Sequence, residues 1–287
     1  MGEFERVGVV GGGQMGAGIA EVCARAGLDV IITEASGELA QASRQRLERS
    51  LERAVKAGKL EPGDRDEALR RLRFTADLGA LADRQLVVEA VVESEDAKVE
   101  VFSQLDKVVE DPGAVFASNT SSIPIMKLAM ATNRRERVLG LHFFNPVPVL
   151  QLVELVPSLL TSDDTIQRAE RFAGEALGKR VIRSKDRAGF IVNMLLVPYL
   201  LSAVRMVESG FASAEDIDAG MVRGCAHPMG PLALIDLIGL DTTMAVAESL
   251  YAEFKEQLYA PPPLLSRMVD AGLLGRKTGR GFYQYDT

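Results

Sequence analysis

The sequence has no tryptophan and only two histidines and two cysteines among its 287 residues. Cys23 and Cys225 are far apart, and each has apolar neighbours, so we expect buried thiols rather than a disulfide or a metal pair. Unpaired thiols suit a reducing compartment, and we expect a cytoplasmic protein. No group of histidine, cysteine and acidic residues has metal-ligand spacing, so we predict no metal site.

The chain also lacks an excess of positive charge and long apolar segments. Its net charge is −7, which argues against nucleic acid or an anionic membrane as the main partner. The longest apolar run, residues 190–204, is interrupted by Asn193, Pro198 and Ser202 and is too short to span a bilayer. Acidic residues precede the first expected strand, so we expect no secretory signal peptide.

What the chain does have is the N-terminal stretch VGVVGGGQMGAGIAEV, which combines an apolar strand, a glycine turn and a helix. Its Gly11, Gly13 and Gly16 have GxGxxG spacing, which permits a tight turn, close approach of a pyrophosphate and close helix packing. The helix would begin near Gln14 and Met15, where free N–H groups face the anion. Between a strand and a helix, this motif predicts a dinucleotide-binding site.

Glu34 follows the next expected strand, residues 28–33, where dinucleotide folds place an acidic residue. A carboxylate there would accept hydrogen bonds from the adenosine ribose and repel a 2′-phosphate, which favours NAD over NADP. The alternative is a solvated loop residue. The combination of strand, glycines, helix, strand and acid favours the cofactor site.

Residues 37–73 are highly charged, with leucines at helical spacing and breaks at Gly58 and Pro62. They predict a helical hairpin inserted into the dinucleotide fold. Its basic residues are either a solvated face with charge pairs along the helix, or an arm that meets an anionic substrate.

Further apolar runs predict an α/β domain with a doubly wound sheet over residues 1–185, followed by a nearly all-helical domain over 186–287. Ligands bind beyond the carboxyl ends of parallel strands, so the polar residues 118–122, including Asn119, are candidates for the site. The expected strands are residues 86–92, 114–117, 138–144, 151–156 and 179–182, with 282–285 as a possible last strand.

The two histidines differ in their surroundings. His142 lies at the end of an expected strand, where it could accept the hydroxyl proton as hydride leaves an alcohol. Glu154, on an expected neighbouring strand, could orient the imidazole and stabilise its charged form. His227 stands before Pro228, and we interpret it as structural.

Several longer stretches resemble the short L-3-hydroxyacyl-CoA dehydrogenases, and especially the bacterial 3-hydroxybutyryl-CoA dehydrogenases. The likeness extends over nearly the whole chain, and its GLHFFNPVP and GFIVN stretches are more specific than the glycine motif. The matching stretches are GGGQMGAGIA, LVVEAVVE, ASNTSSIPI, GLHFFNPVPVLQLVELV, DRAGFIVNMLLVPYL, HPMGPLALIDLIGLDT and GRKTGRGFYQY.

The resemblance implies a Rossmann-type domain followed by an all-α dimerisation domain, NAD as cofactor, and a homodimer formed through the second domain. It implies oxidation of (S)-3-hydroxyacyl-CoA, with short substrates such as 3-hydroxybutyryl-CoA. His142 would be the catalytic base and Glu154 its partner. Ser121 would contact the substrate near the reacting carbon, and Asn193 would hold the catalytic geometry from the second domain.

The resemblance also implies binding residues. Glu34 would bind the ribose, and Glu93, Lys98 and Lys277 match family positions that touch the dinucleotide. Two residues of the arm, Ser50 and Lys56, match positions that meet coenzyme A. Where some relatives have a second lysine, this chain has Ala57.

Two alternatives to an acyl-CoA dehydrogenase remain at this stage. Relatives of the fold oxidise free hydroxy acids such as gulonate or carnitine, and the basic arm favours a thioester only modestly. Lens crystallins related to the family are non-catalytic dinucleotide-binding proteins. The presence of His142, Glu154, Ser121 and Asn193 together argues against a protein without activity.

Overall fold

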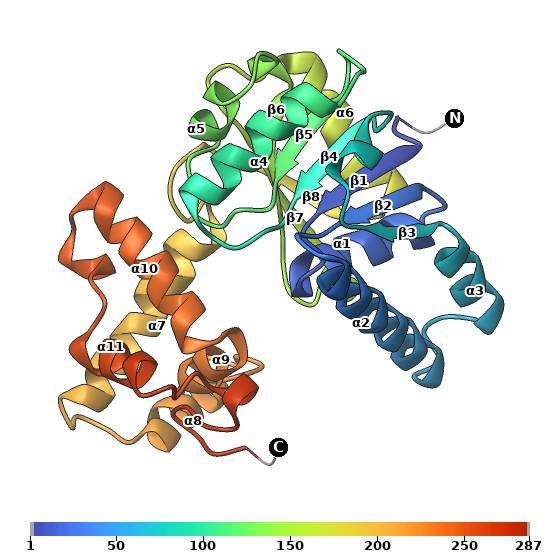
Figure 1. Ribbon diagram of the computed structural model, residues 1–287. Coiled ribbons are helices and arrows are strands. Elements are labelled where there is room, and N and C mark those ends of the chain that lie inside the picture. Colours follow the sequence, from blue (N-terminus) through green and yellow to red (C-terminus); the bar gives the residue numbers. More distant parts are fainter. Residues whose placement is uncertain (1–2, 286–287) are drawn as a thin grey trace. The chain divides into compact units, whose positions relative to one another are not determined.

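A computed structural model of the chain describes residues 3–285 and divides into two compact units. The first unit ends at Asp186, and the second begins at Arg187 (Figure 1). Each unit has a hydrophobic core of its own. Among the described residues, no helix is long and apolar enough to cross a membrane.

The first unit is built on an eight-stranded sheet with the order β3-β2-β1-β4-β5-β6-β7-β8. Neighbouring strands are parallel, except that β7 runs antiparallel to β6. The strands are β1 (Arg6–Val10), β2 (Asp29–Thr33), β3 (Leu72–Thr75), β4 (Leu86–Glu89), β5 (Val115–Ser118), β6 (Val138–Phe143), β7 (Leu152–Pro157) and β8 (Arg180–Arg183).

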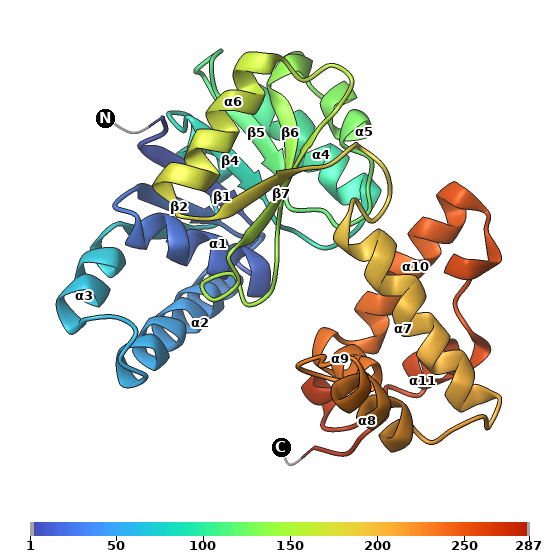
Figure 2. The same ribbon diagram turned by 180° about the vertical axis from the view of Figure 1, so that it is seen from behind.

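Helices cover both faces of this sheet, so its central strands are mostly apolar and are buried over their full lengths. Helices α4 and α5 lie on one face (Figure 1), and α1 and α6 lie on the other (Figure 2). The hairpin of α2 and α3 packs against α1. The helices are α1 (Gln14–Arg25), α2 (Gly37–Lys56), α3 (Pro62–Arg70), α4 (Glu95–Val108), α5 (Ile125–Met130) and α6 (Asp163–Arg171).

The edges of this unit differ from the sequence-based prediction. The last two residues of the expected hairpin, Leu72 and Arg73, begin the unpredicted strand β3. As an edge strand with one fully buried residue, β3 lacks the apolar run of the inner strands. The six-residue helix α5 was also not expected, because it is too short to show a repeating helical pattern of apolar residues.

The second unit is helical, as predicted. Its longest helix, α7, runs through Pro198 and packs against α9, α10 and α11. Ser213 caps α8 by accepting a hydrogen bond from the Asp216 N–H at 3.1 Å. The helices are α7 (Val192–Glu208), α8 (Ala214–Gly224), α9 (Pro231–Ile238), α10 (Leu240–Phe254) and α11 (Pro263–Asp270).

Two expectations need correction, one for residues 282–285 and one for Cys225. The helix α11, with Pro263 as its first residue, was not predicted. In the expected strand 282–285, only Gln284 pairs, in an isolated bridge with Arg280. Cys23 is buried, which raises the pKa of its thiol to about 12. Cys225, expected to be buried, is exposed because it follows the end of α8.

Candidate active site

The predicted glycine turn joins β1 to α1 and has no room for side chains at Gly11, Gly12 and Gly16. Gly11 has a φ of +89°, and a Cβ there would lie 2.8 Å from the Ala90 carbonyl oxygen. A Cβ on Gly16 would lie 1.8 Å from the Gly11 carbonyl oxygen, so α1 can approach the turn only with glycine. Gly13 is exposed, with no atom within 4 Å of a Cβ placed there. The turn therefore leaves an open backbone face before the N-terminus of α1, which suits a pyrophosphate.

Glu34, half-buried after β2, is tied to this turn. Its Oε1 accepts a hydrogen bond from the Gly12 N–H at 2.7 Å. The Gly12 carbonyl accepts from Ser43 Oγ at 2.6 Å and from an Arg46 guanidinium N–H at 2.8 Å. Both donors belong to α2, so the arm helix and Glu34 fix the backbone of the glycine turn together.

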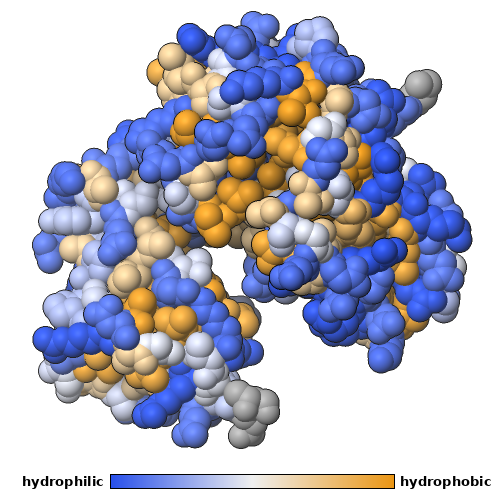
Figure 3. Space-filling model, viewed as in Figure 1, coloured by the Kyte–Doolittle hydropathy of each residue, from blue (hydrophilic) through white to orange (hydrophobic). Residues whose placement is uncertain are grey.

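An apolar cavity of about 530 Å³ lies beside the turn and includes Glu34 in its lining. Gly11 and Gly13 line it from the turn, and Leu39 and Val101 line it from α2 and α4. Figure 3 shows hydrophobic residues on this face of the unit, between α4 and α2. An apolar pocket with one acidic residue at the end of β2 fits an adenosine group.

His142 and Glu154 face each other across two neighbouring strands. They are directly paired in the antiparallel register of β6 and β7, which puts both side chains on one face of the sheet. His142 Nδ1 lies 2.7 Å from Glu154 Oε2, and both residues are buried. The other ring nitrogen, Nε2, lies 3.1 Å from Ser121 Oγ. Because a carboxylate only accepts, Nδ1 is the donor to Glu154, and in the neutral imidazole Nε2 therefore presents its lone pair.

The loop after β5 is held from several sides. Asn119 Oδ1 accepts a hydrogen bond from the Phe143 N–H at 2.8 Å, so this predicted cofactor residue ties the loop to β6. Further along, the N-terminus of α5 donates to Asp186, with Ile125 N at 2.7 Å and Met126 N at 2.9 Å. Ser121 thus lies in a loop fixed at both ends.

Glu93 and Lys98 belong to a polar cluster at the ends of β4 and β5. The Lys98 ammonium is buried between Glu89 Oε1 at 2.6 Å and Glu93 Oε2 at 3.3 Å. Partial burial raises the pKa of Glu93, but the Lys98 charge and hydrogen bonds from Thr120 and Ser121 outweigh it. The pKa of Glu93 therefore lies below its ordinary value.

The arm residues expected at coenzyme A lie toward the C-terminal end of α2. Ser50 and Arg53 line a cavity of about 190 Å³, whose opposite wall is the loop Asn145 to Pro148 that follows β6. Lys56 is exposed in the last turn of α2. Ser50 thus lies close to a loop that begins three residues after His142, whereas Lys56 projects beyond it.

Two predicted site residues belong to the second unit. Asn193 is the second residue of α7 and is partly buried. Lys277 lies in a short helical turn and forms an ion pair with Asp241 at 2.5 Å. His227, interpreted as structural, has its Nδ1 3.2 Å from the Tyr199 hydroxyl.

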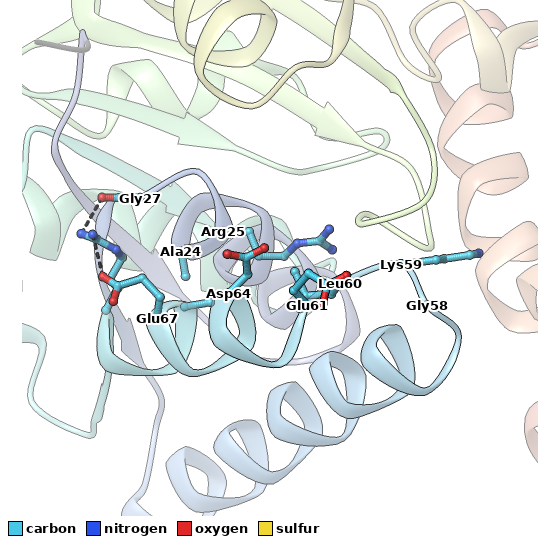
Figure 4. A pocket seen from close by; sticks show the side chains of 11 residues that line it. Ala24, Arg25, Gly27, Gly58, Lys59, Leu60, Glu61, Asp64 and Glu67 are labelled. Carbon is cyan, nitrogen blue, oxygen red and sulfur yellow. Dashed lines mark hydrogen bonds and ion pairs between the residues drawn. The ribbon is translucent and has the colours of Figure 1, made fainter.

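Another cavity, of about 470 Å³, lies where the end of α1 meets the turn between α2 and α3 (Figure 4). Both positive and negative side chains line it, including Arg25, Lys59, Asp64 and Glu67. Arg71, which also lines the cavity, donates to the Gly27 carbonyl and pairs with Glu67. No predicted site residue lines this cavity.

Sequence reasoning missed one member of the polar cluster at the site, Glu89. Glu89 accepts from Ser118 Oγ at 2.6 Å and from the Val91 N–H at 2.7 Å. Its signal was available, because a glutamate inside the otherwise apolar run LVVEAVV must have a buried partner. Thr120 was among the candidate residues 118–122, but its hydrogen bond to Glu93 depends on the path of the loop.

The fold and site of the first unit define a dinucleotide-dependent oxidoreductase. A family model for the 3-hydroxyacyl-CoA dehydrogenase NAD binding domain matches residues 6–187. The model for the C-terminal domain of the same family matches residues 189–285. The chain therefore belongs to the 3-hydroxyacyl-CoA dehydrogenase family and is an NAD-dependent dehydrogenase, as its motifs predict.

Individual relatives agree with this assignment over their full lengths. The chain is 62% identical to 3-hydroxybutyryl-CoA dehydrogenase of Mycobacterium tuberculosis (strain H37Rv), covering 98% of this chain and 99% of the relative. The crystal structure of M. tuberculosis FadB2 superposes with a TM-score of 0.97 at 62% identity, covering 99% of each chain. The crystal structure of (S)-3-hydroxybutyryl-CoA dehydrogenase from Ralstonia eutropha superposes with a TM-score of 0.92 at 46% identity, covering 99% of this chain and 100% of the other.

Proposed function

We propose that this protein oxidises (S)-3-hydroxyacyl-CoA to 3-ketoacyl-CoA with NAD⁺ and catalyses the reverse reduction, with 3-hydroxybutyryl-CoA as a substrate. The observation that carries the proposal is the alignment of Ser121 Oγ, the His142 ring and Glu154, with separations of 3.1 and 2.7 Å. The names of the relatives, which specify 3-hydroxybutyryl-CoA, support the short acyl chain.

His142 is the base of this reaction. NAD⁺, when bound, supplies the acceptor for the hydride from C3 of the substrate. The substrate hydroxyl gives its proton to the lone pair of His142 Nε2. Glu154, buried and 2.7 Å from Nδ1, stabilises the resulting imidazolium. In the reduction, the same imidazolium returns the proton to the carbonyl oxygen.

Ser121 and Asn193 complete the catalytic set. Ser121 Oγ already makes a hydrogen bond at Nε2, where the substrate oxygen must arrive, so its hydroxyl can bond that oxygen next to the imidazole. We assign Asn193 a supporting role from the second domain. This part of the assignment rests on the family resemblance.

The cofactor site is assigned to the glycine turn and the cavity beside it. Gly11, Gly13 and Gly16, with the helix start at Gln14 and Met15, hold the pyrophosphate. The ribose binds at Glu34, whose charge selects NAD. Asn119, Glu93, Lys98 and Lys277 are the other proposed dinucleotide positions. Asn119 and Lys98 are both buried, so they support the dinucleotide site through their contacts with neighbouring residues.

Coenzyme A is assigned to the arm. Ser50 and the exposed Lys56 lie on α2, where Arg53 and Arg46 add positive charge near the loop that follows His142. A free hydroxy acid has no phosphates for these cations to meet. The arm therefore favours a thioester substrate over a free acid.

The test compares two substrates with the same reacting carbons. Purified protein should oxidise NADH with acetoacetyl-CoA far faster than with free acetoacetate, followed by NADH absorbance. Equal rates with both would support a free-acid dehydrogenase, and no turnover with either would indicate a dinucleotide-binding protein without catalysis.

Assembly and location are further parts of the proposal. The second unit has exposed apolar side chains, among them Leu195 on α7 and Phe211, and these support a homodimer formed through this unit. The unpaired thiols of Cys23 and Cys225 support a cytoplasmic location.

A further inference from the structure

Glu93 receives hydrogen bonds from three consecutive residues of the loop that carries Ser121. Its Oε1 accepts from Thr120 Oγ1 at 2.5 Å, from the Ser121 N–H at 2.8 Å and from Ser122 Oγ at 3.2 Å. One carboxylate oxygen therefore organises the whole turn. A contact made only for a dinucleotide would not need this arrangement.

The middle residue of that turn is the one that meets the base. The Ser121 backbone N–H is bound to Glu93, while its Oγ lies 3.1 Å from His142 Nε2. A shift of the backbone at Ser121 therefore changes the distance from its hydroxyl to the imidazole. Small displacements of reacting groups have large effects on rate.

Glu93 is itself held in place. Its other oxygen lies 3.3 Å from the Lys98 ammonium, which is buried and also bound to Glu89 at 2.6 Å. Glu89 in turn accepts from Ser118 Oγ at 2.6 Å. The loop after β5 is thus tied at its start to Glu89 and at its centre to Glu93, and one lysine joins the two carboxylates.

We propose that Glu93 is a positioning residue of the dehydrogenase reaction, which holds Ser121 at His142 in addition to any contact with the dinucleotide. Lys98 serves this role by fixing the Glu93 carboxylate, because its ammonium is enclosed by Glu89 and Glu93. The inference rests on the proposed function, since it concerns the rate of that reaction.

The decisive variant is Glu93→Gln. An amide keeps the size of the side chain but has only one acceptor oxygen, whereas the carboxylate has two. Its NH₂ group must then face either the Lys98 ammonium or the donors of the loop, so one of the two attachments is lost. We expect kcat for acetoacetyl-CoA reduction to fall about 10- to 100-fold at saturating NADH.

A double-mutant cycle with Ser121→Ala separates positioning from cofactor binding. If Glu93 acts through Ser121, Glu93→Gln should lower kcat in the wild-type background and change it by no more than about twofold in Ser121→Ala. If Glu93 only contacts the dinucleotide, the variant raises the NADH dissociation constant, leaves kcat at saturation unchanged, and has the same effect in both backgrounds. That result would overturn the proposal.

Two further variants complete the experiment. Glu95→Gln removes the same charge two residues away, at the exposed start of α4, and should keep wild-type kcat. Glu93→Asp keeps the charge but shortens the side chain by one methylene, and we expect kcat to fall in this variant too. If the Glu93→Gln protein does not fold, Glu93→Asp tests the proposal in its place. Wild-type kcat in Glu93→Asp would mean that charge alone suffices and would refute positioning.

The proposed function and this inference fail in different ways. Wild-type protein without activity on acetoacetyl-CoA would refute the proposed function and this inference with it. An active wild type with unchanged kcat in Glu93→Gln would refute the inference alone.

Discussion

The two nitrogens of one imidazole have different partners, and the chemistry depends on that difference. Replacing His142 by Gln keeps a polar side chain but removes the base, so we expect kcat to fall by roughly 10²–10⁴-fold. The NADH dissociation constant should stay nearly unchanged, as measured by fluorescence titration. Near-normal turnover would refute the catalytic assignment, and His227 would be tested next.

Glu154 should act only through His142. Glu154→Gln should lower kcat, because a neutral amide stabilises the imidazolium less well than a buried carboxylate 2.7 Å away. Residues that serve one step are not additive, so the double variant should be little slower than His142→Gln alone. Steady-state kinetics on the four proteins measures this. Losses that multiply would instead give Glu154 a separate structural role.

Glu34 should determine the choice of cofactor. Glu34→Ser removes the charge that repels a 2′-phosphate, and it also removes the acceptor for the Gly12 N–H. We therefore expect weaker NADH binding and a smaller preference over NADPH, measured as kcat/KM with each. Glu38→Ser, an exposed change in the first turn of α2, is the control. A wild-type preference for NADPH would contradict the assignment.

At the scale of elements, Asp106 joins α4 to the segment before β6. Its carboxylate accepts from Asn133 N at 2.9 Å and from Arg134 Nε at 2.9 Å. Burial raises the pKa of Asp106, but these bonds outweigh it and leave the pKa below its ordinary value. A lowered pKa in the folded state stabilises the protein above the unfolded pKa of about 4, and this contribution is lost as the pH falls through the folded value.

Asp106→Asn should therefore lower the free energy of unfolding by about 1–3 kcal/mol near neutral pH. The difference from wild type should shrink as the pH falls from about 4 through the lower pKa of the folded state, below which Asp106 is protonated in both states. Urea unfolding at several pH values measures this. Asp96→Asn, at the exposed start of the same helix, should lose much less. A difference that stays constant with pH would contradict the charge-based account.

The elements that the sequence predicts well are those with strong periodic signals. The buried strands β1, β4, β5 and β6 are continuous apolar runs, and α1 follows a motif with a defined geometry. The missed elements β3, α5 and α11 are short and depend on neighbours for burial. The direction of β7 could not be predicted either, because no local sequence pattern distinguishes an antiparallel strand from a parallel one.

For the site, the residue types that carry the chemistry were easier to predict than the contacts between them. A strand-end histidine and a glutamate on a nearby strand were identifiable as His142 and Glu154. Their direct pairing required the register of β6 and β7, which only the folded sheet provides. The bonds from residues 120–122 to Glu93 depend on a loop conformation that no residue type dictates.

At the scale of the whole molecule, the proposed homodimer can be tested by mass. Light scattering at micromolar protein should give twice the chain mass. Leu195→Glu should lower it, because Leu195 is 73% exposed on α7 of the second unit. Leu159→Glu, at a side chain 94% exposed in the first unit, is the matched control and should leave the mass unchanged. A monomeric wild type would refute the dimer.

The contact between the glycine turn and the arm restricts how this sequence can diverge. A Cβ on Gly12 would lie 1.9 Å from Ser43 Oγ and 2.7 Å from its Cβ. Any larger residue at position 12 therefore requires a change at position 43, where Ser43 also holds the Gly12 carbonyl. The middle position of a GxG turn is usually free to vary. In this protein it can change only as a pair with Ser43 of α2, so the glycine turn and this helix are bound to evolve together.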